Sequence, residues 1–360
     1  MKQTTTLLTI ALLALCAAGC EKPEPVVNPV DSIPTDPVET GHALVLNEGL
    51  WGGNNASLSY LDLAAGTMEN DWFGSANQRG LGDLGQDLLV YGTKAYVTVS
   101  ESCSLEVIDT TTGLSTRISL GQRYPRYIAA EGGKLYVTCY RPQSVVRIDT
   151  ASLEVEATCS LGVFNPEGLA VAGGKLLVAS SNISDAQGTF SYDNHLYVIG
   201  LDHFGVDTTL VVGSNPQKVI ALDANRVAVN YIGNYADEPA GCAVVDATDL
   251  TVSQVGLGLT NFTVCSGTIY GYLQEWAADY SGKSTTFTKV EGVAPYTATP
   301  LLTSVSINPY AIGIHPVSGN IYLGSDGNYS ANGDLYCYTP SGTLLWKRTA
   351  GMLPSKIVFF

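Results

Sequence analysis

The chain has 360 residues, of which 45% are apolar and 14% charged, and it contains 38 Gly and 16 Pro. These proportions are those of a folded globular protein and exclude extended disorder or a collagen-like repeat for most of the chain. Lys and Arg number 18 against 33 Asp and Glu, a net charge of −15, so a basic footprint for nucleic acid is missing. Eight Cys without a C-x-x-C pair and four scattered His show no recognisable zinc-binding spacing.

Residues 1–19 are predicted to be a lipoprotein signal peptide. Lys2 precedes an apolar run from Leu7 to Ala18, which is too short to span a bilayer. The small residues directly before Cys20 resemble the lipobox of bacterial lipoproteins, in which cleavage leaves a diacylated cysteine at the N-terminus. We therefore expect lipidation at Cys20 and a membrane anchor made of that lipid alone. The alternative is an ordinary signal peptide that happens to contain a cysteine.

Residues 20–41 are predicted to form a tether. Five Pro and five acidic residues lie between Glu21 and Gly41, with no aromatic residue, and this composition favours an extended, solvated segment. Acidic residues directly after the lipidated cysteine also resemble the signals that send some Gram-negative lipoproteins to the outer face of the outer membrane. The expected location is therefore the outer membrane, exposed at the cell surface.

From residue 43 onward, short apolar and β-branched runs alternate with Gly, Asn, Asp and Pro, and no convincing helical periodicity is present. One unit opens at Pro125 with strands predicted at 126–130, 135–139, 144–149 and 153–161, and the next unit opens in the same way at Pro166. A period of about 40 residues with four short strands in each repeat is the sequence signature of propeller blades.

The first strands of successive blades are predicted at 87–91, 126–130, 167–171, 217–222, 261–265, 310–315 and 355–360. The last of these has no partner after it, whereas the first blade, with strands at 43–47, 57–63 and 67–73, lacks a first strand. Pairing residues 356–360 with residues 43–47 would give the last strand a partner and the first blade its first strand. It would also remove two open sheet edges. The predicted fold of residues 42–360 is therefore all-β, a seven-bladed β-propeller whose ring is closed by the C-terminal strand.

One rim of such a propeller carries the loops between second and third strands together with the blade-to-blade connections. Several loops expected on this rim are long, at 49–56, 180–194, 231–240, 274–284 and 326–333, whereas the opposite rim has tight turns such as 92–93 and 132–133. Long loops on a rigid scaffold commonly carry binding residues. We therefore expect the long-loop rim to be the working face.

The long loops combine aromatic rings with amides, the pairing expected for a planar or sugar-like ligand. Blade-to-blade segments add Arg79, Arg123, Tyr124, Arg126 and Lys218, which could meet anionic groups of a ligand. The alternative is that the rings only pack the loops on one another. The candidate ligand-binding residues are Trp51, Asn54, Arg126, Tyr140, Arg141, Phe190, Tyr192, Tyr231, Tyr235, Glu275, Trp276, Tyr280, Asn328 and Tyr329.

Motifs for catalysis are missing from the sequence. The run 282–284 (Gly-Lys-Ser) fits a loosened phosphate-loop pattern but lies between two β segments, where no helix N-terminus can meet a phosphate. No G-x-S-x-G elbow occurs, and no Ser, His and acid set can be assembled from the spacing. We therefore predict no catalytic residue and no metal ligand.

Five short segments resemble YncE-like seven-bladed propeller lipoproteins. They are 47–52 (Asn-Glu-Gly-Leu-Trp-Gly), 55–60 (Asn-Ala-Ser-Leu-Ser-Tyr), 81–83 (Leu-Gly-Asp), 124–127 (Tyr-Pro-Arg-Tyr) and 165–168 (Asn-Pro-Glu-Gly), and the resemblance extends over roughly residues 43–360. In this group, BtuG-type surface lipoproteins capture cobalamin and pass it to a TonB-dependent outer-membrane transporter. The resemblance implies a non-enzymatic receptor for cobalamin or another corrinoid, with such a transporter as its partner and no cofactor required.

Two other functions stay open at this point. A propeller enzyme of lactonase or lyase type would need carboxylates and His around the central channel, usually with a divalent cation. The first strands are instead mostly apolar there, as at Leu88, Ile128, Leu169 and Val219. A glycan- or protein-binding scaffold could use the same rim as a corrinoid receptor.

Overall fold

The computed structural model describes residues 39–162, 164–184, 190–277, 279, 281–291 and 294–360. The predictions for the signal peptide, for Cys20 and for most of the tether lie outside these residues. In the described part of the chain the regular elements are β-strands, apart from α1 (Trp72–Asn77) and the short helical turn η1 (Gly327–Tyr329). No helix in that part has the length and hydropathy needed to cross a membrane.

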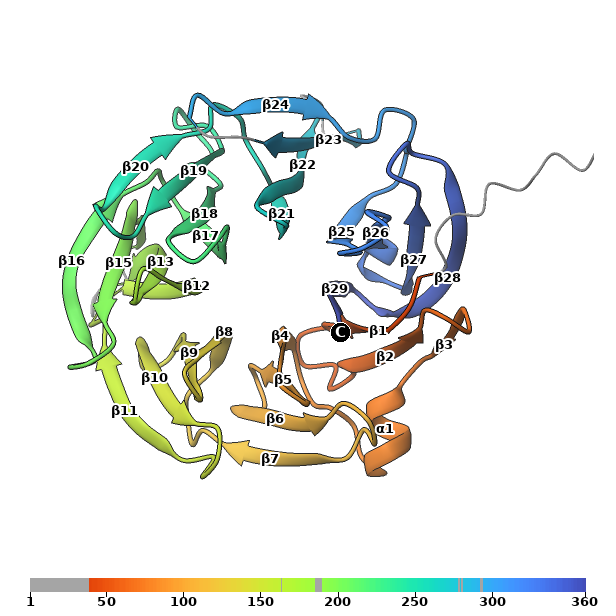
Figure 1. Cartoon of the computed structure of the whole chain (residues 1–360), viewed down its shortest axis with the longest axis horizontal. Helices are drawn as coiled ribbons and strands as arrows, with labels where there is room; N and C mark the ends of the chain where they lie inside the picture. Colours follow the sequence, from red (N-terminus) through yellow and green to blue (C-terminus); the bar gives the residue numbers. More distant parts are fainter. Residues whose placement is uncertain (1–38, 163, 185–189, 278, 280, 292–293) are drawn as a thin grey trace, which may run out of the picture. The chain divides into compact units, whose positions relative to one another are not determined.

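The strands form seven antiparallel blades arranged in a ring (Figure 1), which confirms the predicted fold class for the described residues. The first blade contains β29 (Pro354–Phe359), β1 (His42–Asn47), β2 (Ser57–Asp62) and β3 (Thr67–Glu69), and the second contains β4 (Gly85–Tyr91), β5 (Lys94–Val99), β6 (Ser104–Asp109) and β7 (Ser115–Ser119). The third contains β8 (Pro125–Glu131), β9 (Lys134–Cys139), β10 (Ser144–Asp149) and β11 (Val155–Ser160). The fourth contains β12 (Phe164–Ala172), β13 (Lys175–Ser184), β15 (His195–Gly200) and β16 (Gly205–Val211), with the short β14 (Phe190–Tyr192) paired to β13.

The remaining three blades follow the same order. The fifth contains β17 (Pro216–Ala221), β18 (Arg226–Tyr231), β19 (Gly241–Asp246) and β20 (Thr251–Gln254), and the sixth contains β21 (Asn261–Cys265), β22 (Thr268–Trp276), β23 (Lys283–Glu291) and β24 (Thr297–Pro300). The seventh contains β25 (Pro309–Ile314), β26 (Ile321–Ser325), β27 (Asn332–Tyr338) and β28 (Leu344–Met352). In each blade the first strand lies innermost, so that β29, β4, β8, β12, β17, β21 and β25 surround the centre (Figure 1).

The C-terminal strand closes the ring as predicted. β29 pairs with β1 in antiparallel register, with Val358 opposite Leu44 and Ile357 opposite Val45. Backbone bonds between His42 and Phe360 extend the pairing to the end of the chain. The closure pairs the inner edge of β1, which would otherwise be open, and β29 becomes the channel-lining strand of its blade, as the inner strand does in the other blades.

Hydrophobic cores lie between neighbouring blades. Alternate residues of a strand point to opposite faces of its sheet, so each blade serves two cores. In β1, Leu44 and Leu46 face the second blade, whereas Ala43 and Val45 face the seventh. A similar cluster of buried residues fills each other blade-to-blade interface of the described chain. Because both faces of each blade are covered, strands such as β9 are apolar along most of their length.

Three segments differ from the predicted secondary structure. The third strand of the first blade, predicted at 67–73, ends at Glu69, and helix α1 begins at Trp72. The helical turn brings Trp72 and Phe73 together into the core between the first and second blades, whereas a strand would have pointed them to opposite faces. The loops predicted at 180–194 and 274–284 are partly strand, because β13, β22 and β23 extend their pairing into them, as at Trp276 opposite Lys283.

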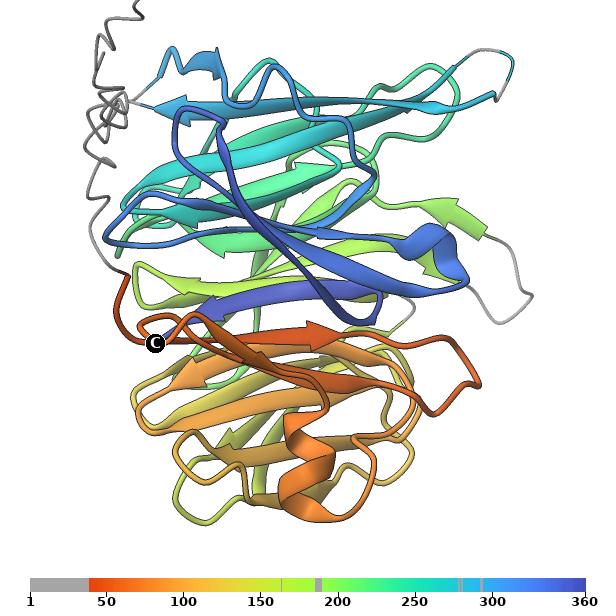
Figure 2. The ribbon, with the colours of Figure 1, turned by 90° about the vertical axis from the view of Figure 1, so that its right-hand side faces the viewer.

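The two rims of the ring differ as the loop lengths predicted. Figure 2 shows the β1–β2 loop, β14, the extended β22–β23 hairpin and η1 reaching toward one rim, on its right-hand side, while the chain ends at Phe360 toward the other. Compact turns, including those after Tyr91 and Glu131, occupy the second rim. We call the first the loop rim and the second the turn rim.

Glu39 is held on the turn rim by the seventh blade. Its carboxylate accepts hydrogen bonds from the Ser318 hydroxyl at 2.6 Å, from the Asn320 amide at 2.9 Å and from the Tyr322 hydroxyl. Ser318 and Asn320 belong to the connection between the first two strands of that blade. The propeller is therefore fixed from Glu39 onward, two residues inside the segment predicted as tether.

Candidate functional site

The central channel opens on the loop rim through a cavity of about 500 Å³, which we call the mouth. Its walls come from the beginnings of the inner strands and the ends of the second strands, which is the rim expected from loop length. The lining residues are Glu48, Gln86, Asp87, Arg126, Tyr127, Gln217, Lys218, Asn230, Ile232, Tyr235, Thr260, Asn261, Tyr272, Gln274, Pro309, Tyr310, Tyr329, Ser355 and Lys356. The mouth is therefore dominated by amides, tyrosines and charged side chains.

A second cavity of about 570 Å³ continues the channel between the inner strands, and we call it the passage. Its walls are mostly apolar, with Leu88, Ile128, Leu169 and Val219 among them, as the first-strand sequences predicted. Four residues line both the mouth and the passage and define a throat between them, namely Asp87, Tyr127, Lys218 and Lys356. The channel thus changes from polar to apolar at the throat.

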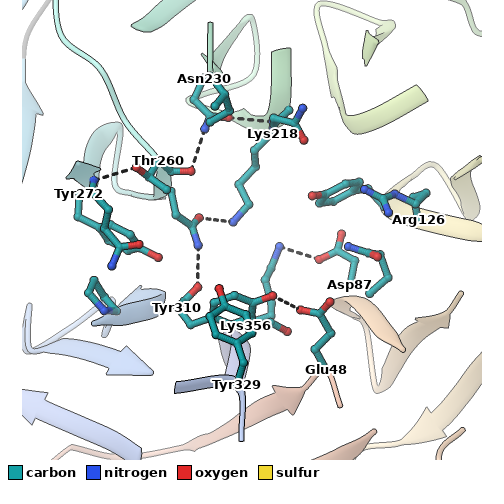
Figure 3. A pocket seen from close by; sticks show the side chains of 18 of the residues that line it. Glu48, Asp87, Arg126, Lys218, Asn230, Thr260, Tyr272, Tyr310, Tyr329 and Lys356 are labelled. Carbon is teal, nitrogen blue, oxygen red and sulfur yellow. Dashed lines mark hydrogen bonds and ion pairs between the residues drawn. The ribbon is translucent and has the colours of Figure 1, made fainter. Parts of the chain in front are cut away.

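Polar contacts in and around the throat join neighbouring blades (Figure 3). Lys356 Nζ of the first blade lies 2.9 Å from Asp87 Oδ1 of the second. Asp87 Oδ2 in turn accepts the backbone N–H of Ile128 in the third blade at 3.1 Å. Arg126 binds Glu167 of the fourth blade, with 2.5 Å between its terminal nitrogen and Oε2. These contacts fix the starts of the inner strands against one another, because each buried charge has a partner on the next blade.

The fifth, sixth and seventh blades are joined in the same way. Lys218 Nζ donates to Asn261 Oδ1 at 2.6 Å, and the Asn261 amide donates to the Tyr310 carbonyl at 2.9 Å. The Tyr310 hydroxyl donates to Glu48 Oε2 at 2.6 Å and completes the circuit to the first blade. Between the fourth and fifth blades the backbones themselves approach, since a Cβ added at Gly168 would lie 2.5 Å from the Val219 nitrogen.

Burial shifts the pKa of two ionisable groups of the mouth toward neutral pH. The pKa of Lys218 is lowered to about 7 by burial and then by the charge of Lys356, against an opposing contribution from Asp87. The pKa of Glu48 is raised by burial, although the hydrogen bond from Tyr310 and the charge of Arg126 act in the other direction. Both groups therefore change charge closer to neutral pH than free lysine or glutamate would.

Exposed aromatic rings are concentrated on the loop rim. Among the described residues, the aromatic side chains left largely exposed are Trp51 and Tyr235 at 77%, Trp276 at 58%, Phe190 at 56% and Tyr329 at 49%, and all belong to loop-rim segments. Such rings would normally be buried, so their gathering on one rim needs a functional reason.

Two chains of ring contacts lead from this rim to the mouth. Tyr192 lies between Phe190 and Tyr235, at centroid distances of 5.1 and 6.0 Å. On the sixth and seventh blades, Lys283 Nζ lies 4.9 Å from the Trp276 ring and 6.0 Å from the Tyr329 ring. Tyr235 and Tyr329 line the mouth themselves. We call Phe190, Tyr192, Tyr235, Trp276 and Tyr329 the aromatic collar.

The structure brings together only part of the predicted residue set. Arg126, Tyr235 and Tyr329 line the mouth, and Phe190, Tyr192 and Trp276 are connected to it by the contacts above. Trp51 is exposed on the loop rim, and Asn54 lines a separate cavity of about 350 Å³. Tyr140, Arg141, Glu275 and Asn328 do not line the mouth, and Tyr280 lies outside the described residues.

Three other predicted side chains are used within the scaffold. The Tyr231 ring packs against Gly213 and Gly241, and its hydroxyl donates to Gln254. Arg79 forms an ion pair with the buried Glu106, and Arg123 bonds the Leu120 carbonyl. These side chains therefore have partners in their own or neighbouring blades, such as the buried carboxylate of Glu106 for Arg79.

Most charged residues in and around the throat were not among the predicted ligand-binding residues. Asp87 and Lys356 belong to the second and first blades and to no motif recognised in the sequence. Glu48 and Glu167 lie within two of the segments that carry the family resemblance, but neither was assigned a role. A usable signal existed, since most inner strands begin with polar residues before their apolar run, as in Gln86-Asp87 and Gln217-Lys218. In the described residues no group of three or more His, Cys, Asp or Glu side chains has the arrangement of a metal site.

No protein-family model and no curated protein matches the sequence, but solved structures share the fold. A quinonprotein alcohol dehydrogenase-like protein from Bacteroides thetaiotaomicron has a TM-score of 0.63 at 16% identity, covering 89% of this chain and 78% of that one. A Bacteroides fragilis protein provisionally named 6-phosphogluconolactonase has a TM-score of 0.61 at 11% identity, covering 90% and 99%. Hydrazine synthase from Kuenenia stuttgartiensis reaches 0.56 at 16% identity, covering 73% and 85%.

At these identities the likeness extends to the fold and not to the function. The chain is thus similar to several Bacteroides propeller proteins and has the β-propeller architecture. Its resemblance to YncE-like and BtuG-type lipoproteins stays a prediction.

Proposed function

We propose that this chain is a non-enzymatic surface lipoprotein that binds a corrinoid, cobalamin foremost, over the mouth and delivers it to a TonB-dependent outer-membrane transporter. The observation that carries the proposal is the gathering of exposed aromatic rings around a polar mouth on one rim. Rigid rings provide apolar contact area at low entropic cost, and they suit a broad, flat ligand.

The polar groups of the mouth fit the same ligand class. A corrin macrocycle carries carboxamide side chains around its edge, and such groups pair naturally with other amides. The mouth provides side-chain amides from Gln86, Gln217, Asn230, Asn261 and Gln274. A cavity of about 500 Å³ is at the small end of ligand sites, so a corrin would lie across the collar and reach into the mouth with its periphery only.

The proposal is tested by titrating cyanocobalamin into the unlipidated chain (Cys20→Ala) while following tryptophan fluorescence and melting temperature. Binding to the folded state should raise the melting temperature. Trp276→Ala should weaken binding by about 1 to 3 kcal/mol, as expected for the loss of one stacking ring. The matched control is Leu344→Ala, because Leu344 is 48% exposed at a connection on the turn rim.

The outcomes separate the competing functions. Binding that resists added salt supports ring stacking, since exposed charge pairs are screened. No binding of cyanocobalamin up to its solubility, together with binding of an oligosaccharide that Trp276→Ala abolishes, would replace the corrinoid by a glycan. The transporter step is tested separately, because loss of the lipoprotein should slow cobalamin uptake by cells at limiting concentrations.

A propeller enzyme is a second candidate, favoured by one observation. Lys218 lies in the throat with a pKa of about 7, lowered by burial, and lysines of this kind can accept a proton during catalysis. Hydrolysis of a lactone that is lost in Lys218→Met and kept in Lys94→Met would favour this candidate over a receptor.

A further inference from the structure

Three cationic side chains reach the mouth from three different blades. Arg126 comes from β8, Lys218 from β17 and Lys356 from β29, each near the beginning of its inner strand. Arg126 is neutralised by Glu167 and Lys356 by Asp87. Lys218 donates instead to an amide oxygen, that of Asn261 at 2.6 Å, and forms no ion pair with a described carboxylate. An ammonium group has three N–H donors, so this bond occupies only one of them.

The two lysines face the same cavity. Figure 3 shows the side chains of Lys218 and Lys356 extending into the space between the strands, and both residues line the mouth and the passage. The charge of Lys356 also acts on Lys218 and disfavours its protonation. A negative group placed between them would relieve this repulsion and use the remaining N–H donors.

The charged side chains around the two lysines do not exclude such an anion. The titratable or charged residues that face this part of the channel are Glu48, Asp87, Arg126, Tyr127, Glu167, Tyr272, Tyr310 and Lys356. Asp87 is already bonded by Lys356 and by two backbone N–H groups, and Glu167 by Arg126 and the Ser181 hydroxyl. Burial raises the pKa of Glu48 and so favours its neutral form. A protonated Lys218 therefore carries positive charge that Asp87 offsets only from a distance, without a direct ion pair.

We propose that the throat is an oxyanion subsite in which Lys218 and Lys356 together hold a phosphate or carboxylate group of the ligand. The inference rests on the proposed function only in that the rest of the ligand lies on the aromatic collar. It deepens that function by requiring the ligand to present a negatively charged arm long enough to enter the mouth. Amides such as Asn261 and Gln217 line the same space and can donate to the remaining oxygens.

Such a subsite has a definite pH dependence. An anion binds more tightly to the protonated form of Lys218, so binding raises the pKa of that group from its starting value of about 7. Near pH 7 about half of the unliganded lysines are neutral, and binding should then take up about half a proton. The affinity should fall as the pH rises through 7, approaching about tenfold per pH unit above it.

The test uses small anions that do not themselves titrate. Dimethyl phosphate and acetate both stay singly charged between about pH 6 and 9, and trimethyl phosphate is the neutral control. Each is titrated calorimetrically into the unlipidated chain (Cys20→Ala), in two buffers of different ionisation enthalpy so that protons taken up are counted. The two anions distinguish a phosphate from a carboxylate arm.

Three variants distinguish binding from a structural role of Lys218. Lys218→Met should weaken anion binding at least about tenfold at pH 6, the effect of losing one charge-assisted contact. Lys218→Arg should still bind anions but without the pH dependence, because arginine stays charged. Lys94→Met removes a lysine that pairs with Asp109 on the turn rim and should behave as wild type.

Anion affinity at pH 6 that is equal in wild type and Lys218→Met would overturn the subsite. Parallel titrations with cyanocobalamin keep this result separate from the proposed function. Anion binding with the expected pH profile but no cyanocobalamin binding rejects the corrinoid and supports the subsite. Cyanocobalamin binding without anion binding supports the corrinoid and rejects the subsite.

Discussion

The two rims of the propeller are built in opposite ways. On the turn rim the second and third blades use one device twice. Lys94 pairs with Asp109 at 2.9 Å and Lys134 with Asp149 at 2.7 Å, and each aspartate also accepts two backbone N–H groups of the following turn. On the loop rim the loops differ from blade to blade in length and in composition. Repeated local chemistry therefore builds the ring, and the departures from the repeat are concentrated on the loop rim, where we propose that the ligand binds.

The largest effect on stability should follow deletion of residues 354–360, because this strand closes the ring that carries both rims. The first blade would lose its inner strand, and the Lys356–Asp87 pair would be lost with it. Exposed edges would then replace a closed ring. We expect the cooperative unfolding transition to disappear when circular dichroism is followed against temperature. A truncated chain that melts like the full one would contradict the role of ring closure.

A smaller effect is expected at the channel wall, on the side of the mouth. Gly168 lies in β12, and a Cβ there would come within 2.5 to 2.8 Å of the backbone of Gln217, Lys218 and Val219. Gly168→Ala should therefore push β12 and β17 apart and cost about 1 to 3 kcal/mol in the free energy of unfolding, as overpacking does. Urea unfolding measures the loss of free energy of unfolding, and titration with cyanocobalamin should show weaker binding as well.

Gly80→Ala is the matched control for Gly168→Ala, because a Cβ at Gly80 meets no atom within 4 Å. Its free energy of unfolding should stay near that of wild type. Equal effects in the two variants would mean that the close approach of β12 and β17 does not limit the packing of the channel wall.

The smallest effect is expected on the turn rim, from Asp109→Asn. The hydrogen bond from Lys94, followed by those from the turn, lowers the pKa of Asp109 to about 2 from an ordinary value of 3.8. A lowered carboxyl pKa adds stability that is present above the ordinary value and is lost as the pH falls through about 2. The urea midpoints of wild type and variant should therefore differ slightly at pH 5 and converge toward pH 2. A difference in urea midpoint that persists at low pH would contradict this role of the Asp109 carboxylate. Weaker binding of cyanocobalamin by Asp109→Asn would contradict a purely structural role of the turn rim.

Most of the fold was predictable from the sequence because each blade repeats the same pattern. The inner strand predicted at 126–130 is observed as Pro125–Glu131, and the closing strand predicted at 355–360 is observed as Pro354–Phe359. Helix α1 was not predicted, since six residues are too few to show helical periodicity. Its helical turn follows from tertiary packing, as the Trp72 ring contacts Gly113 of the next blade.

The rim that carries the candidate site was predictable from the sequence, but most residues that line the mouth were not. Loop lengths located the rim and its exposed rings, because such lengths are visible along the chain. Successive residues of the throat, from Asp87 to Lys356, are about 40 to 140 positions apart in the chain, and no spacing rule joins them. Tyr231 was predicted from its place beside a long loop, and the structure packs its ring against Gly213 and Gly241, a contact that no sequence pattern indicated.

The grip of the seventh blade on Glu39 has a mechanical consequence. A force applied to the chain before Glu39 would be transmitted to Ser318, Asn320 and Tyr322 on the turn rim. This is the rim opposite the mouth. With the lipid anchor that we propose at Cys20, the propeller would be attached at its turn rim. The loop rim would then face away from the point of attachment.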